Sequence, residues 1–187
     1  MDDRDHKILD AAIDVCSRYG MRKATMGDIA ERAGISRPTL YARYANKDEI
    51  MTAAMQLISE RVVHEVTQAW RPAESTGERL DIFLDCAIVR FFDQIQQMPD
   101  ASDLLTGHGE GSMAAHVVAD QGKINLLAGL FESRKEALAT HGSNPAALAE
   151  FFYASSSSFK FTARDAAHLK SLLATLKQST IAMLGEG

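Results

Sequence analysis

The sequence has few prolines, which break helices, and no apolar run long enough to cross a membrane. Only four prolines occur in 187 residues, at positions 38, 72, 99 and 145, so long helices fit between them. No apolar run approaches the roughly 18 to 20 residues that a membrane span needs. The first ten residues, MDDRDHKILD, are charged rather than signal-like. We therefore expect a cytoplasmic protein with no membrane partner.

Cysteine is scarce, and the common enzyme motifs are missing. Cys16 and Cys86 have neither metal-ligand nor CxxC spacing, so we predict two small buried residues in a reducing compartment. The sequence has no nucleophile elbow, dinucleotide fingerprint or HExxH helix, and TGHGEGS lacks the Lys-Ser/Thr of a phosphate loop. These absences argue against an enzyme and a bound cofactor, although an enzyme is the main alternative of a different class.

Charge is distributed unevenly along the chain. The net charge is -5, but residues 1–50 carry nine basic and nine acidic groups, whereas residues 51–187 carry eleven and sixteen. Between positions 18 and 47, seven basic side chains stand against only Asp28 and Glu31. This local basic excess is what contact with DNA phosphates requires.

Apolar residues repeat at helical rather than strand spacing, which predicts an all-α fold. A first helix ends at Gly20, and its apolar stripe is predicted to consist of Ile8, Ala11, Ala12, Val15, Cys16 and Tyr19. Thr25 is expected to cap a second helix that ends at Gly34. Ser36 is expected to cap a third helix, with Pro38 in its first turn.

The three-residue connection Gly34–Ile35–Ser36 between two short helices is typical of a helix-turn-helix. Such a motif places its second helix in the major groove, where the N-terminal residues of that helix reach base edges. Arg37 can offer a bidentate fork to guanine, whereas Pro38 and the Thr39 methyl group suit contact with a thymine methyl. Tyr41 completes the candidates on this helix.

Residues 24–50, ATMGDIAERAGISRPTLYARYANKDEI, resemble the DNA-binding signature of the TetR family. The matching elements are Thr25, Ile29, Ala30, Ala33, Gly34, Ile35, Ser36, Thr39, Leu40, Tyr41, Tyr44, Asn46, Lys47 and Asp48. The resemblance implies a three-helix DNA-binding domain at 1–47 and a helical ligand-binding and dimerisation domain at 48–187. It also implies phosphate contacts at Thr25, Tyr41, Arg43 and Lys47. The predicted DNA contact set is therefore Thr25, Ser36, Arg37, Pro38, Thr39, Tyr41, Arg43 and Lys47.

The motif departs from its relatives at Gly27, where they often carry a polar or basic residue that supplements recognition. Arg43 replaces a frequent histidine with a permanent charge. Two alternatives stay open: Tyr41 packs inside the domain instead of contacting phosphate, and Lys23 and Arg32 are solvated surface residues.

Beyond this motif the chain agrees with the family only in length and helical character. Asn46 is expected to cap a long fourth helix that runs to Pro72. Further helices are expected at about 78–98, 101–107, 112–140, 146–161 and 165–184.

The last two of these helices are predicted to pair with those of a second copy, because a palindromic operator requires a two-fold dimer. The leucines of the last helix recur near heptad spacing. The predicted interface consists of Phe152, Ser156, Phe159, Leu169, Leu172, Leu173 and Leu176. The alternative is that this stripe belongs to the core of one chain.

Helices between 78 and 140 are expected to surround a cavity for a small, largely apolar effector. The candidate lining residues are Trp70, Phe83, Phe91, Phe92, Met98, Leu105, Met113, Val117, Leu127 and Phe131. Ordinary core packing is the alternative for each of them. His108, Glu110 and His116 suggest a metal or polar ligand site, but their glycine-rich setting is more typical of an exposed break between helices.

Together these features predict a transcriptional repressor that a small molecule releases from a palindromic operator. The fourth helix would transmit the signal, since a small pivot would spoil the spacing of about 34 to 36 Å between two recognition helices. An architectural DNA-binding protein without a ligand is the remaining alternative, which a solid core in residues 78–140 would support.

Overall fold

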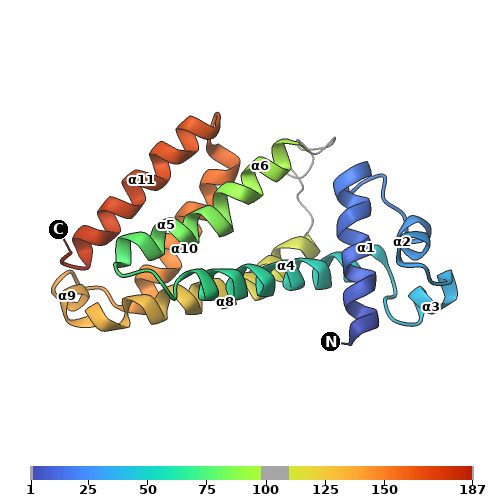
Figure 1. The fold of residues 1–187 in the computed structure, drawn as a ribbon, viewed down its shortest axis with the longest axis horizontal. Helices are drawn as coiled ribbons and strands as arrows, with labels where there is room; N and C mark the ends of the chain where they lie inside the picture. The colour runs from blue at the N-terminus through green and yellow to red at the C-terminus, as the bar shows by residue number, and fades with distance from the viewer. Residues whose placement is uncertain (1, 98–109, 187) are drawn as a thin grey trace. The chain divides into compact units, whose positions relative to one another are not determined.

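The computed structural model describes residues 2–97 and 110–186, and within 110–119 it describes the backbone only. Over these ranges the chain is helical, with no strand, as the sequence predicts (Figure 1). None of the described helices is both long enough and apolar enough to span a bilayer. The chain forms two compact units. The first unit holds residues 1–59 and the described residues among 95–119, and the second unit holds 60–94 and those described from 120 onward.

The first unit begins with α1 (Asp3–Tyr19), α2 (Met26–Ala33) and α3 (Arg37–Tyr41), followed by the start of α4 (Lys47–Ala69). The predicted caps are confirmed. The Thr25 side chain accepts from the Asp28 N–H, and the Asp28 carboxylate accepts from the Thr25 N–H. Gly34 ends α2 in the left-handed conformation, at φ 66° and ψ 38°, which glycine adopts without a steric penalty. Ser36 caps α3.

The core of the first unit forms where the apolar faces of α1 and α2 meet α3 and the start of α4. Its largest fully buried side chains are Ile8, Leu9, Ile29, Leu40 and Ile50. Tyr19 does not join them, contrary to the predicted stripe, because it is 56% exposed. It stands at the last position of α1 and lines a surface hollow between α1 and α2.

The second unit contains the rest of α4 and the remaining described helices, except that residues 95–96 of α6 and 110–119 of α8 belong to the first unit. The remaining helices are α5 (Thr76–Leu84), the π-helical turn η1 (Asp85–Val89), α6 (Arg90–Gln96), α8 (Glu110–Phe131), the 3₁₀ turn η2 (Glu132–Arg134), α9 (Lys135–Thr140), α10 (Pro145–Thr162) and α11 (Ala166–Met183). Helices α5 and η1 pack against α10 and α11 (Figure 1). The compact units divide after Ser59, inside α4. The domain boundary at 47/48 stays a prediction.

Two predicted helices of the second unit are interrupted. The segment at 78–98 contains the π turn, in which the Arg90 N–H donates to the carbonyl of Asp85, five residues earlier. The segment at 112–140 changes to a 3₁₀ turn at Glu132 before α9. The predicted helix at 101–107 lies outside the described residues.

Aromatic side chains form the centre of the second unit's core. Phe152 lies with its ring centroid 6.3 Å from that of Phe83 and 6.4 Å from that of Phe131. All three rings are fully buried, and tilted or edge-on pairs at such separations are favourable. These contacts tie α5, α8 and α10 together.

Candidate DNA-binding interface

The exposed face of α3 is built by one N-terminal cap and a proline. The Ser36 side chain accepts from the Thr39 N–H at 3.2 Å, and the two hydroxyl oxygens lie 2.7 Å apart. Pro38 occupies the first turn, where a missing N–H costs nothing. Leu40 is fully buried and holds the helix onto the core. The helix therefore presents Ser36, Arg37, Pro38 and Tyr41 to solvent.

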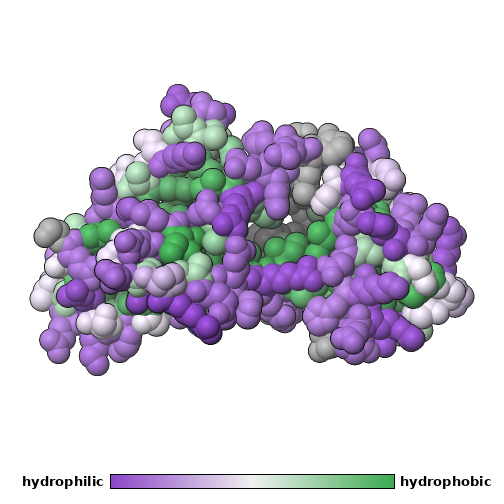
Figure 2. All heavy atoms as spheres, viewed as in Figure 1, coloured by the Kyte–Doolittle hydropathy of each residue, from purple (hydrophilic) through white to green (hydrophobic). Residues whose placement is uncertain are grey.

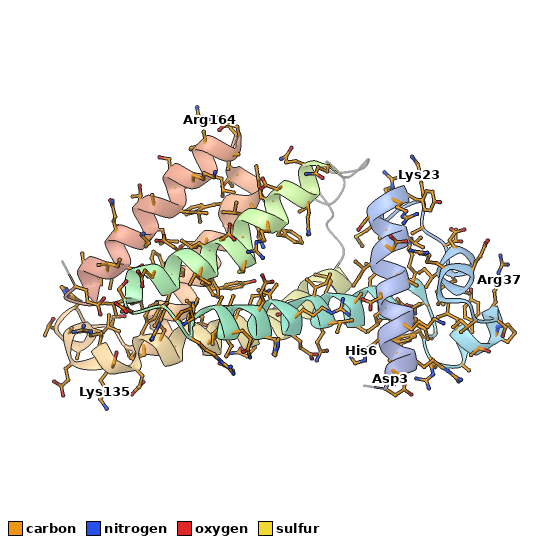
Figure 3. The ribbon with its side chains drawn as sticks, in the orientation of Figure 1. Asp3, His6, Lys23, Arg37, Lys135 and Arg164 are labelled. Atoms are coloured by element: carbon orange, nitrogen blue, oxygen red, sulfur yellow. The ribbon has the colours of Figure 1, made fainter. Side chains whose placement is uncertain are left out.

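Arg37 extends over Gly27 on α2. A Cβ atom built on Gly27 would lie 2.5 Å from Nη2 of Arg37, so the missing side chain leaves the room that the guanidinium occupies. Asp28 is the next residue; its pKa is lowered chiefly by hydrogen bonds from Thr25, with a smaller contribution from the charge of Arg37. Figure 3 shows Arg37 on the outer side of α2 and α3, and Figure 2 shows mainly hydrophilic residues over the same helices.

Tyr41 and Thr25, two of the predicted phosphate contacts, have a hydroxyl group on the exposed surface. Tyr41 is 52% exposed, so its hydroxyl is free to meet a phosphate. The Thr25 hydroxyl is on the exposed N-terminus of α2 but donates to Asp28 at 2.7 Å. Its backbone and hydroxyl are already used in the cap.

The other two predicted phosphate contacts have partners inside the first unit. Arg43 forms ion pairs with Asp2, at 2.8 Å, and with Asp5. The hydrogen bond to Arg43 is the main reason that the pKa of Asp2 falls to about 2. The Lys47 ammonium donates to the carbonyl oxygens of Met21 and Ala24, at 2.8 and 3.0 Å. Lys47 therefore also holds the loop before α2.

The structure places the predicted ligand-lining residues in the core of the second unit. Phe83, Leu127 and Phe131 are fully buried, Phe92 is nearly so, and Trp70 and Phe91 are partly buried. The Trp70 indole N–H donates to the carbonyl of Arg79 at 2.7 Å. Met98, Leu105, Met113, Val117, His108, Glu110 and His116 lie outside the described side chains.

The predicted dimer residues mostly belong to the core of the single chain. Phe152, Ser156, Leu169, Leu173 and Leu176 are all buried there, and Phe159 and Leu172 are half-buried. Phe152, Leu169, Leu173 and Leu176 belong to the core that α10 and α11 form with α5 and η1 within one chain. The opposite face of this helix pair is the one open to a partner.

That opposite face, called here the α10–α11 face, carries an apolar stripe that the sequence reasoning missed. Two phenylalanines on α10 are exposed, Phe151 at 58% and Phe161 at 48%. At 3.6 residues per turn they lie in one row with smaller side chains, and α11 adds a face of small residues. The exposed members are Ala147, Phe151, Ala154, Ser158 and Phe161 on α10, with Ala167, Ser171 and Ala174 on α11.

The first unit coincides with a known family of sequences. Residues 8–54 match the family described as bacterial regulatory proteins, tetR family. The chain is 36% identical over 95 residues to the HTH-type transcriptional activator FasR of Mycolicibacterium smegmatis, which covers 51% of this chain and 42% of FasR. It is 30% identical over 79 residues to the uncharacterized HTH-type transcriptional regulator YvdT of Bacillus subtilis, covering 42% and 41%. The match thus spans less than half of each relative's length.

The whole chain shares its fold with solved regulators. The fatty acid degradation regulator FadR from Bacillus halodurans superposes with a TM-score of 0.68 at 20% identity, covering 96% of this chain and 95% of that one. FadR from Bacillus subtilis, solved in complex with stearoyl-CoA, gives a TM-score of 0.65 at 16% identity, covering 91% and 96%. Residues 8–54 thus match the tetR family of bacterial regulatory proteins, and the whole chain has the fold of these solved regulators.

Proposed function

We propose that the protein is a transcriptional regulator that binds a palindromic operator as a homodimer and is released from it by a small-molecule effector. One observation carries the proposal: α3, capped by Ser36 and anchored by the buried Leu40, has Arg37, Pro38 and Tyr41 exposed on a compact helix-turn-helix unit. Arg37 is the base-reading residue of this proposal, and Tyr41 contacts phosphate.

Selection of bound duplexes from a random pool, with the full-length protein, tests this assignment. We expect an enriched sequence with two inverted half-sites about one helical turn apart, since a two-fold dimer presents two α3 helices. Enrichment of a single half-site would contradict the dimer, and no enrichment above random DNA would contradict sequence-specific regulation.

The pairing of Arg43 with two acids gives a prediction about phosphate contact. Replacing both acids, Asp2→Asn and Asp5→Asn, should raise the affinity for operator and random DNA alike, because it frees the Arg43 guanidinium and removes two negative charges. Exposed ion pairs are weak, so an increase of only about two- to tenfold is expected. Asparagine keeps the α1 cap, since its side-chain oxygen still accepts from the N–H of residue 5.

Fluorescence anisotropy at several salt concentrations measures this effect, and the double variant should show the steeper salt dependence. Asp3→Asn is the matched control, because Asp3 is exposed in the same turn of α1 and the structure shows no bond from it to Arg43. A double variant that binds DNA no better than the control would remove Arg43 from the phosphate contacts.

The α10–α11 face is the proposed dimer interface. Contiguous exposed apolar surface on a soluble protein commonly marks an association site, and exposed phenylalanines are unfavourable in water unless a partner covers them. The small side chains of α11 allow a second helix pair to approach closely. This face replaces the buried leucines as the part of the predicted interface that contacts the partner.

The effector is proposed to bind among the helices of the second unit. In support, FadR from B. subtilis, which has the same fold, holds stearoyl-CoA. The two compact units share α4, so a ligand that favours a different position of its C-terminal half can change the position of the α3 pair on DNA. A second unit that proves solid, with no ligand-sized space, would contradict this part.

Repression is the proposed regulatory outcome, and activation is the second candidate because FasR carries the name of an activator. Transcription in vitro from a promoter that contains the selected operator separates the two. We expect less transcript with added protein and recovery when an effector releases it. More transcript with added protein would favour an activator.

A further inference from the structure

Three polar side chains meet inside the second unit, between α8 and α10. Lys123 donates to the carboxylate of Asp120 at 3.1 Å and to the Tyr153 hydroxyl oxygen at 3.2 Å, and that hydroxyl donates to the same carboxylate. The side chains of Lys123 and Asp120 are only 12% and 24% exposed. Burial, together with the negative charge of Asp120, raises the pKa of Tyr153, which stays neutral. Lys123 therefore balances the single negative charge of this group.

Lys160 is a second cation beside this balanced group. It follows Tyr153 by seven residues on α10, so both side chains lie on one face of the helix. Its ammonium lies 4.7 Å from the centroid of the Phe91 ring and 5.9 Å from that of Phe161. The structure shows no carboxylate bonded to it among the residues with described side chains. Burial lowers its pKa to about 8; the charge of Lys123 acts in the same direction, and the charge of Asp120 opposes it more weakly.

The resulting surplus of positive charge calls for an anion. A partly desolvated ammonium that lies over aromatic rings and is bonded to no described carboxylate loses hydration that a ring does not fully replace. Phe91 lies two residues after the last residue of the π turn η1, and such turns are frequent at functional sites. Phe91 is also one of the residues predicted to line the effector cavity.

We propose that Lys160, supported by Lys123 and by the ring of Phe91, binds the acidic headgroup of the effector, a carboxylate or a phosphate joined to an apolar chain. The inference rests on the proposed function, because it names the chemical class of the ligand that the regulator senses. The headgroup supplies the negative charge that Asp120 does not provide, and the apolar part lies among the aromatic and aliphatic side chains of the second unit.

The test measures binding of three eight-carbon probes to the full-length protein by calorimetry: octanoate, octyl phosphate and octanol. Both anions should bind and the alcohol should bind at least about tenfold more weakly, since charge-assisted hydrogen bonds are lost. Lys160→Met should weaken both anions by about tenfold or more, whereas Lys160→Arg should retain them. Lys170→Met, at an exposed lysine of the same unit, is the matched control.

Thermal unfolding of the ligand-free proteins separates binding from a structural role. Lys160→Met should unfold at the same or a higher temperature than the wild type, because it removes a desolvated charge that faces Lys123. If the ammonium served only to hold the rings of Phe91 and Phe161, Lys160→Met would lower the unfolding temperature and leave octanoate binding unchanged. That result would overturn the proposal, and so would a wild-type protein that binds neither anion or binds octanol equally well.

The pH dependence gives an independent readout. Above pH 8 the free site must take up a proton at Lys160 to bind octanoate, so the affinity should fall between pH 8 and pH 10 in the wild type and not in Lys160→Met. The other titratable groups around Lys160 are Asp120 and Lys123 from α8 and Tyr153 from α10, while α6 contributes the neutral ring of Phe91.

DNA binding is measured separately, on ligand-free protein. A protein that binds octanoate but no DNA would leave the anion site standing and remove the proposed regulator. A protein that selects an operator but binds neither anion would support the proposed regulator and overturn the anion site.

Discussion

Phe151→Glu should turn the dimer into monomers and lower the affinity for a two-half-site operator by on the order of 10² to 10⁴, the usual gain from linking two binding modules. Phe151 is 58% exposed in the single chain, so glutamate there is harmless to the fold of one chain. In the dimer the same position is covered, and burying an unpaired carboxylate is strongly unfavourable. Sedimentation equilibrium gives the association state, and fluorescence anisotropy gives the affinity.

The control for this variant is Ala139→Glu, which introduces the same charge at an exposed position of α9, away from the α10–α11 face. It should remain dimeric and bind DNA normally. A charge at Leu173 is a poor test, because this leucine is 4% exposed within one chain and the variant would unfold the second unit. A wild type that sediments as a monomer at micromolar concentration would contradict the interface and the palindromic operator together.

Arg37→Ala should lower operator affinity by about 1 to 3 kcal/mol, or roughly 5- to 150-fold, and relax the preference at one base pair of each half-site. The reason is geometric: Arg37 is at the N-terminal end of α3 and its guanidinium extends freely over Gly27. Its affinity for random DNA should change far less. Competition against random duplexes, followed by single-base substitutions in the operator, measures both effects.

Tyr41→Phe is the matched comparison. It removes one exposed hydroxyl that is proposed to contact phosphate, so operator and random DNA should weaken by the same modest factor. Lys47→Ala is less suitable, because the ammonium also binds the carbonyl oxygens of Met21 and Ala24 and its loss would disturb the loop before α2. Equal losses on both DNAs for Arg37→Ala would make Arg37 a phosphate contact and leave the base-reading residue unidentified.

The helix-turn-helix could be predicted in detail because its signals are local. A cap such as Thr25 or Ser36 accepts a hydrogen bond from a backbone N–H only three residues away. Gly34 predicts the left-handed turn because glycine has no Cβ atom. Tyr19 is the exception. It has the right spacing for the apolar stripe, but it is the last residue of α1 and is exposed, and spacing alone does not show how far the neighbouring helix extends along that stripe.

The second unit was predicted less well, for a physical reason. Apolar spacing shows that a helix face is buried but not what buries it. The spacing of Leu173 and Leu176 is therefore compatible with a dimer interface and with the core of one chain, and both residues lie in the core. Phe151 and Phe161 are exposed, but they are not part of the heptad-spaced leucines from which the interface was predicted. The polar group of Asp120, Lys123 and Tyr153 joins distant parts of the sequence. The one local signal was a lysine between two phenylalanines at 159–161.

The π turn at Asp85–Val89 has a consequence for how the chain tolerates changes in length. A π turn spans one residue more than the α turn that it replaces, so the helix holds an extra residue without rotating α6. Losing one residue inside this turn should restore plain α geometry and leave Phe92 facing the core. The same loss inside α5 would rotate α6 by about 100°. The helix thus contains one short stretch where the loss of a residue is absorbed, and this stretch ends two residues before Phe91.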